Sequence, residues 1–254
     1  MCLYVHFGSF SIPSYGLLIA LGVIIANLAA LFVLKKTQLD FNDFIILEAY
    51  CFLGAFIGSK LLYLIVSFQD IDWKKMTEPS YFHALMQSGF VFYGGLILGL
   101  AFIFIAGKIH HINPAPYIRN FVFLIPLIHC FGRVGCFMAG CCYGIPYDGI
   151  GAVVFPENSF ALPGVKLFPI QLVEAGLLII ISVVLFLLQL KKNYYYTIEF
   201  YLISYGITRF ILEYFRYDEI RGSLGILTTS QWLSIFLIAA AAVSIFYFHR
   251  SPRR

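Results

Sequence analysis

The chain has 254 residues, of which 61% are hydrophobic and only 12% charged, and its net charge is +4. A soluble domain would be about 45–50% apolar and about 25% charged, so this composition excludes an ordinary soluble protein. The charge is modest and no long Lys/Arg-rich stretch occurs, so we expect no nucleic-acid partner.

Seven apolar segments have roughly the length that crosses a bilayer, which is about 20 residues. They span residues 15–34, 44–68, 90–106, 117–137, 170–190, 198–215 and 231–248. We therefore predict an all-α integral membrane protein with seven transmembrane helices, and we expect residues 1–254 to form a single polytopic domain. Residues 1–13 lack the positive charge of a cleavable signal peptide, so the first span is predicted to be permanent.

Basic residues at the segment ends predict the orientation. They are Lys35, Lys36, Lys108, Arg119, Lys191, Lys192, Arg250, Arg253 and Arg254. All of them fall on one side of the seven-span arrangement, and the positive-inside rule places that side in the cytoplasm. The N-terminus is then outside and the C-terminus cytoplasmic. The outer loops, residues 69–89, 145–169 and 216–229, carry the acids Asp70, Asp72, Glu78, Asp148, Glu157, Asp218 and Glu219.

The stretch 132–144 reads Gly-Arg-Val-Gly-Cys-Phe-Met-Ala-Gly-Cys-Cys-Tyr-Gly and ends the fourth span. An arginine at such a depth is unfavourable unless an anion or a water-filled cavity receives it. Gly132, Gly135 and Gly144 keep side chains away, which lets a ligand approach Arg133. A guanidinium binds two phosphate oxygens at once. We predict that Arg133 holds a lipid phosphate; the alternative is an anchor that reaches the head groups.

Two further spans carry polar groups at the same predicted depth. Arg209 and Glu213 are four residues apart and so share a helix face. Either the two side chains form a self-contained ion pair, or Glu213 orients Arg209 toward an anion. Gln171 and Glu174 share a face at the start of the fifth span, where a structural hydrogen-bonding role and a catalytic role both remain open.

Tyrosines next to glycines occur at the predicted outer ends of the first and third spans. Tyr15 precedes a glycine, and Tyr93 precedes Gly94 and Gly95. Tyrosine is common at the membrane interface, so a simple interfacial position is one interpretation. The adjacent glycines favour the other interpretation, in which both tyrosines line a ligand site.

The six cysteines include a close group, Cys136, Cys141 and Cys142. Their spacing is not a standard zinc-binding pattern, and we expect neither a metal nor a cofactor. A disulfide on the outer face, a reactive thiol and simple packing of small side chains remain open for this group. The outer loop 145–169, with its prolines and glycines, is expected to be irregular.

Five stretches together resemble the phosphatidylglycerol–prolipoprotein diacylglyceryl transferase family over nearly the whole chain. They are Pro13-Ser14-Tyr15-Gly16, Tyr93-Gly94-Gly95-Leu96, Gly132-Arg133-Val134-Gly135, Pro169-Ile170-Gln171-Leu172-Val173-Glu174 and the run from Tyr205-Gly206 to Arg216. The glycine–arginine signature is the most specific of these. Their order and the seven-span plan also fit the family.

The resemblance implies a bacterial inner-membrane enzyme whose site faces the outer leaflet. Phosphatidylglycerol would donate its diacylglyceryl group to the lipobox cysteine in the signal peptide of a prolipoprotein, and glycerol phosphate would leave. The implied catalytic residues are Arg133, Arg209, Tyr93 and Glu213. The implied substrate-binding residues are Arg133, Tyr15, Gly94, Gly95, Gly132, Gly135, Cys136, Cys141, Gly144, Gln171 and Glu174.

The chain departs from the family pattern at several polar positions. Tyr93 stands where the family has a histidine, and Cys136, Ala139 and Cys141 stand where it has two asparagines and a glutamate. These departures leave two alternatives open. One is a lipid transferase in which Cys136 or Cys141 itself takes part; the other is a non-catalytic membrane redox or lipid-binding protein.

Overall fold

Helices dominate the computed structural model, which describes residues 4–7, 10–87, 89–157, 159–192, 195–217 and 223–250. The chain divides into two compact units, Met1–Lys36 with Arg119–Arg254, and Thr37–Ile118. Whether the chain behaves as a single membrane domain remains a prediction. Of the residues used in the orientation and cysteine arguments, Cys2, Asp218, Glu219, Arg253 and Arg254 lie outside the described residues.

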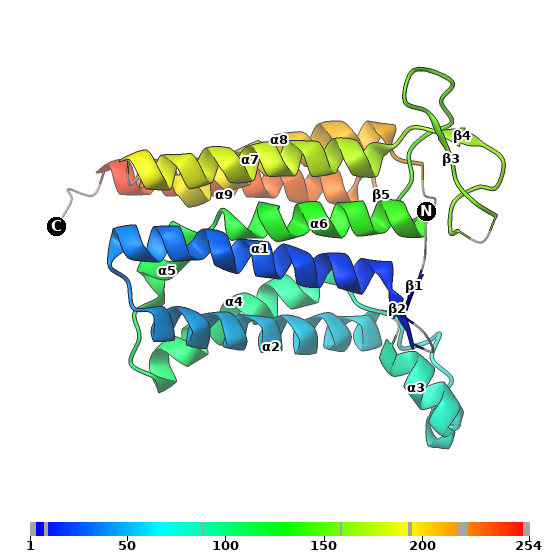
Figure 1. The fold of residues 1–254 in the computed structure, drawn as a ribbon, viewed down its shortest axis with the longest axis horizontal. Coiled ribbons are helices and arrows are strands. Elements are labelled where there is room, and N and C mark those ends of the chain that lie inside the picture. The colour runs from blue at the N-terminus through cyan, green and yellow to red at the C-terminus, as the bar shows by residue number, and fades with distance from the viewer. Residues whose placement is uncertain are drawn as a thin grey trace. The chain divides into compact units, whose positions relative to one another are not determined.

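Each predicted span overlaps a helix (Figure 1). The helices are α1 (Ser14–Thr37), α2 (Phe41–Val66), α4 (Phe92–Ile109), α5 (Pro114–Phe121), α6 (Leu124–Ala139), α7 (Ile170–Lys192), α8 (Thr197–Leu212) and α9 (Thr229–Arg250). Within the described residues, α1, α2, α7 and α9 are long and apolar enough to cross a membrane, and the bent pair α5–α6 would make a fifth span. A helical, multi-pass membrane protein is therefore confirmed, while the number seven and the orientation remain predictions.

The predicted fourth span, residues 117–137, is interrupted rather than continuous. Helix α5 ends at Phe121 and α6 begins at Leu124. Pro126 has no N–H to donate to the carbonyl of Val122, and its ring would crowd that carbonyl in a continuous helix. The Val122 carbonyl instead accepts from the N–H of Ile125, at 3.1 Å.

In the unit Thr37–Ile118, helices α2 and α4 pack through glycines. A Cβ on Gly58 would lie only 2.2 Å from the carbonyl oxygen of Gly94, and a Cβ on Gly54 would lie 2.5 Å from that of Leu98. Small residues allow such close approach between membrane helices. Outside this pair, a 3-10 helix η1 (Trp73–Thr77) and the short helix α3 (Pro79–Gln87) follow α2.

In the other unit, α6 packs on α7, α7 on α8, and α8 on α9 (Figure 1). Helix α1 lies against α6, where a Cβ on Gly22 would meet the side chain of Phe131 at 2.9–3.0 Å. The Ser182 hydroxyl of α7 donates to the buried Phe123 carbonyl at 2.9 Å. Close packing at these contacts holds α6 and α7 in a defined register.

The short strands are β1 (Tyr4–Phe7), β2 (Phe10–Pro13), β3 (Val153–Val154), β4 (Lys166–Leu167), β5 (Ser223–Leu224) and β6 (Leu227–Thr228).

The loop expected to be irregular, residues 145–169, has a small core of its own. Strands β3 and β4 pair antiparallel, and Phe155, Ala161 and Leu167 are buried together. The aromatic rings of Phe137 and Tyr143, which lie before the loop, pack against this cluster. Burial of these side chains ties the loop to the end of α6.

Candidate functional site

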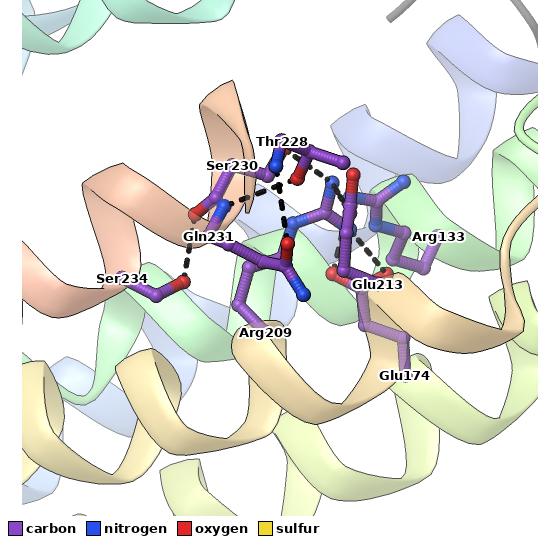
Figure 2. A network of polar contacts seen from close by, with 8 residues as sticks. All are labelled: Arg133, Glu174, Arg209, Glu213, Thr228, Ser230, Gln231 and Ser234. Carbon is purple, nitrogen blue, oxygen red and sulfur yellow. Dashed lines mark hydrogen bonds and ion pairs between the residues drawn. The ribbon is translucent and has the colours of Figure 1, made fainter. Parts of the chain in front are cut away.

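A buried carboxylate, Glu174, lies between two arginines. It occupies the second turn of α7 and is 1% exposed. Nη2 of Arg133, on α6, is 3.1 Å from its Oε1, and Nη1 of Arg209, on α8, is 3.7 Å from its Oε2. Three helices therefore contribute one charged side chain each to a shared cluster (Figure 2).

The second arginine of the cluster has two further partners. Nη2 of Arg209 is 2.9 Å from Oε2 of Glu213, one turn further along the chain, and donates to the Ser230 hydroxyl at 3.0 Å. The ion pair suggested by the four-residue spacing is thus present, and Arg209 also contacts Glu174. Glu213 begins the 3-10 helix η2 (Glu213–Phe215), which follows α8 directly.

The charges of the two arginines and the two glutamates balance, and all four side chains are almost entirely buried. The arginine side chains are only 13% and 11% exposed, and the glutamates 2% or less. Buried ions are tolerated when they are paired and hydrogen-bonded. Two donors remain: Nε of Arg133 and Nη1 of Arg209 are buried without a hydrogen-bond partner among the described residues. Such donors can bind an anion that enters the cluster.

The start of α9 supports the Arg209 side of the cluster, a feature that our sequence reasoning missed. The N–H of Thr228 donates to Oε1 of Gln231 at 3.1 Å, and the N–H of Gln231 donates to the Thr228 hydroxyl at 3.3 Å. This reciprocal pair is a capping box, and the Thr-x-x-Gln pattern would have revealed it. The cap fixes the first turn, from which Ser230 reaches Arg209 (Figure 2).

Tyr15 lies against the glycine face of α6. A Cβ on Gly135 would be 2.7 Å from Cδ2 of Tyr15, and a Cβ on Gly132 would be 3.8 Å from its hydroxyl oxygen. These glycines therefore make room for the tyrosine ring beside the helix that carries Arg133. The ring remains half-exposed, so it lines the edge of the cluster.

The chain after α6 forms a tight turn that carries the cysteines. Gly140 ends the helix in the left-handed conformation, with φ of 74°, and Cys142 is also left-handed, with φ of 56°. Buried Gln171 of α7 donates from Nε2 to the Cys141 carbonyl at 2.8 Å. Gly144 lets the backbone after α6 come close to the backbone of Phe168, because a Cβ there would lie 2.5 Å from the carbonyl oxygen of Phe168.

The three cysteine sulfurs of this turn converge. The Sγ atoms of Cys136, Cys141 and Cys142 all lie within 4.8 Å of one another, and each side chain is partly exposed. No disulfide joins them, and Cys51 and Cys130 are free as well. Cys136 is three residues after Arg133 on the same helix face, so the sulfurs border the charged cluster.

The expected residues of α4 belong to the other unit. Tyr93 is half-exposed, while Gly94 and Gly95 are buried. A Cβ on Gly94 or Gly95 would lie 2.2 Å or 3.0 Å from a carbonyl oxygen of α2. Both glycines therefore serve helix packing. Their role in substrate binding and the catalytic role of Tyr93 remain predictions.

A further residue near the arginines was not given a role from the sequence. His129 lies one turn before Arg133 on α6, and its ring makes an edge contact with Tyr205 of α8, with centroids 5.5 Å apart. The four-residue spacing to Arg133 was the available signal, because it places both side chains on one face.

The sequence is similar to those of known proteins over almost the whole chain. The description of the prolipoprotein diacylglyceryl transferase family matches residues 3–247. The chain belongs to this family. It is 36% identical over 236 residues to phosphatidylglycerol–prolipoprotein diacylglyceryl transferase 2 of Clostridium perfringens, covering 89% of this chain and 87% of the relative.

Two other relatives cover the diacylglyceryl transferase chain almost completely. The phosphatidylglycerol–prolipoprotein diacylglyceryl transferase of Clostridium tetani is 31% identical over 239 residues, which is 94% of this chain and 92% of the relative. One from Streptococcus agalactiae serotype Ia is 28% identical over 253 residues, covering 97% and 95%. Membership in a transferase family favours an enzyme over the redox or lipid-binding alternative.

Proposed function

We propose that this chain transfers the diacylglyceryl group of phosphatidylglycerol to the lipobox cysteine thiol of prolipoproteins, releasing glycerol phosphate. The names of its relatives support the donor, the acceptor and the reaction class. The observation that carries the proposal within this chain is the pair of arginines that share Glu174, with Nε of Arg133 buried and without a hydrogen-bond partner among the described residues.

The two guanidiniums have distinct parts in this reaction. Arg133 binds the lipid phosphate through Nε and a terminal nitrogen, which is the paired geometry that phosphate favours. Arg209 adds positive charge as the leaving glycerol phosphate becomes a dianion, and fixed charge in a dry site stabilises such a transition state. Glu174 and Glu213 hold the arginines in place, since each contacts Arg209 within 4 Å.

The residues around Arg133 and the orientation of the chain indicate where the substrates would lie. Tyr15 borders the phosphate position, because Gly132 and Gly135 let its ring pack against the helix that carries Arg133. The family resemblance, together with the glycines that follow Tyr93, assigns Tyr93 a catalytic role and Gly94 and Gly95 a role in substrate binding. The family resemblance implies a plasma-membrane protein, and the distribution of basic residues favours a cytoplasmic C-terminus and a site toward the outer leaflet.

A direct assay tests the proposal. Purified protein in nanodiscs is incubated with phosphatidylglycerol and a lipobox peptide, and mass spectrometry measures the thioether-linked diacylglyceryl product. We expect product from the wild type and a loss of about 10²–10³-fold for Arg133→Ala, because a charge-stabilising donor is removed. Lys166→Met, which changes only an exposed side chain of the outer loop, should retain activity.

The same variants should behave alike in cells. In a strain depleted of its own transferase, wild type and Lys166→Met should restore growth, and Arg133→Ala should not, at equal protein levels. If the wild type makes no product under conditions in which the C. perfringens relative does, the proposed reaction is wrong for this chain.

A further inference from the structure

The spacing of Cys136, Cys141 and Cys142 in the sequence predicted no metal, but in the folded chain their sulfurs converge at the end of α6 as the ligands of a metal site do. Thiolates are soft ligands that favour Zn²⁺ and Cu(I). Tetrahedral Zn–S bonds of about 2.3 Å place sulfurs about 3.8 Å apart, and the Sγ atoms of Cys136, Cys141 and Cys142 already lie within 4.8 Å of one another. Side-chain rotations that move the sulfurs by about 1 Å would bring them to the separation of zinc ligands.

The surrounding chain holds these sulfurs in place. Cys136 is anchored on the last turn of α6, and its carbonyl accepts from the N–H of Cys141 at 3.1 Å. The buried Gln171 holds the Cys141 carbonyl. Cys142 adopts a left-handed backbone, as Gln38 and His111 do after α1 and α4, and this conformation turns the chain back after α6.

Charge near the turn also suits three thiolates. Arg133 interacts electrostatically with Cys136 and Cys142, and Arg216 interacts with Cys142. Residue 216 is brought to this place by a backbone bridge to Gly144. Two guanidiniums therefore offset the negative charge that three coordinating sulfurs would carry.

The number of ligands decides what kind of site this is. Within the described ranges, no fourth His, Cys, Asp or Glu joins the three cysteines. A structural zinc takes four protein ligands, whereas a catalytic zinc keeps an open position. The proposed reaction needs a thiolate as its nucleophile, yet Glu174 and Glu213, the carboxylates nearest Arg133 and Arg209, are both held by guanidiniums.

We propose that Cys136, Cys141 and Cys142 bind Zn²⁺ and that its open position takes the acceptor thiol of the lipoprotein substrate. This inference rests on the proposed transferase function. The metal coordinates the thiol and displaces its proton to solvent, which supplies a bound thiolate beside the arginine that holds the lipid phosphate.

The transfer step then balances without a redox change. The coordinated sulfur attacks the glyceryl carbon that bears the phosphate ester, so an S–C bond forms and the C–O bond breaks. The electron pair of that C–O bond leaves with glycerol phosphate next to Arg133. The thioether product carries no negative charge and is a weaker ligand, so it dissociates and reopens the fourth position.

Metal analysis tests the site independently of transfer. Reduced protein is incubated with Zn²⁺, desalted and analysed by mass spectrometry for metal content. We expect one zinc per chain in the wild type and in the control Cys51→Ser/Cys130→Ser, which changes cysteines outside the turn. The variant Cys136→Ser/Cys141→Ser/Cys142→Ser should lose it, and Cys142→Ala alone should weaken it. If the wild type holds no more zinc than the triple variant, the site is overturned.

Cobalt substitution tests the open position. A lipobox peptide should shift the sulfur-to-cobalt charge-transfer bands of the Co²⁺ protein, and the same peptide with serine in place of its cysteine should not. Unchanged bands would overturn the assignment of the fourth position. The circular dichroism melting curve of each variant checks that it remains folded. If the triple variant does not fold, the single variant Cys142→Ala takes its place in the zinc measurement.

Turnover separates the two proposals. We expect a chelator to reduce thioether formation about 100-fold, the range for a supplied proton acceptor, and Zn²⁺ to restore it. Full activity after complete zinc removal would overturn the metal proposal and leave the transferase proposal standing. Bound zinc that ligates the peptide, with no thioether product, would overturn the transferase proposal instead.

Discussion

The Arg133 guanidinium lies 3.1 Å from the buried Glu174 carboxylate. The same carboxylate also reaches Arg209 at 3.7 Å, so it is shared between helices α6 and α8. Its position makes it the electrostatic link of the cluster, because removing it would leave two buried cations facing each other.

We predict that Glu174→Gln destabilises the protein by about 3–5 kcal/mol, the usual effect of removing one partner from a buried ion pair. Glu213→Gln, which leaves the Glu174 contacts intact, should destabilise it less. Melting temperatures measured in the same detergent compare the two. Equal melting temperatures for Glu174→Gln and the wild type would show that Glu174 does not hold the arginines together.

A methyl group on the Tyr15-facing side of α6 should be poorly tolerated. Gly135→Ala places its Cβ 2.7 Å from the Tyr15 ring, and overpacking of this kind destabilises by about 1–3 kcal/mol. Gly176→Ala is the matched control, since nothing lies within 4 Å of its Cβ; it should be neutral or stabilising by up to about 1 kcal/mol. Thermal unfolding measures both, and an unchanged melting temperature for Gly135→Ala would contradict the observed packing.

Two buried glutamines of α7 offer a comparison of position. Gln171 donates to the Cys141 carbonyl at 2.8 Å, and Gln189 donates to the Arg119 carbonyl at 3.1 Å. Gln171→Leu should release the cysteine turn and raise the rate of maleimide labelling at Cys141 and Cys142, whereas Gln189→Leu should not. Peptide mass spectrometry assigns the labelled thiols. Equal labelling rates in both variants would mean that Gln171 does not position the turn.

The orientation predicted from basic residues can be checked with introduced cysteines. A membrane-impermeant maleimide applied to intact spheroplasts should label Ile150→Cys, because residue 150 is fully exposed in the predicted outer loop. Gln38→Cys, which follows α1 and the basic pair at its end, should react only after the membrane is opened. Labelling in excess of the native cysteines is the readout, and the reverse pattern would invert the topology.

Much of the fold followed from local sequence features. The long uncharged runs predicted the positions of the apolar helices, because burying a backbone in lipid requires a continuous apolar segment. The pair Arg209 and Glu213 was also predictable, since residues four apart meet on one helix. The break between α5 and α6 was missed, although Pro126 was visible, because one proline inside an apolar run does not by itself say where a helix ends.

The sequence by itself determined a helical membrane protein with an arginine that needed an anionic partner, because hydrophobicity and charge act on each segment separately. Only the tertiary structure decided that Glu174 contacts this arginine and that three cysteine sulfurs meet at the end of α6. It also decided that Gly94 packs against Gly58. The contacts of Arg133 with Glu174 and of Gly94 with Gly58 join residues far apart in the chain, and they depend on how helix surfaces fit together, which no local pattern encodes.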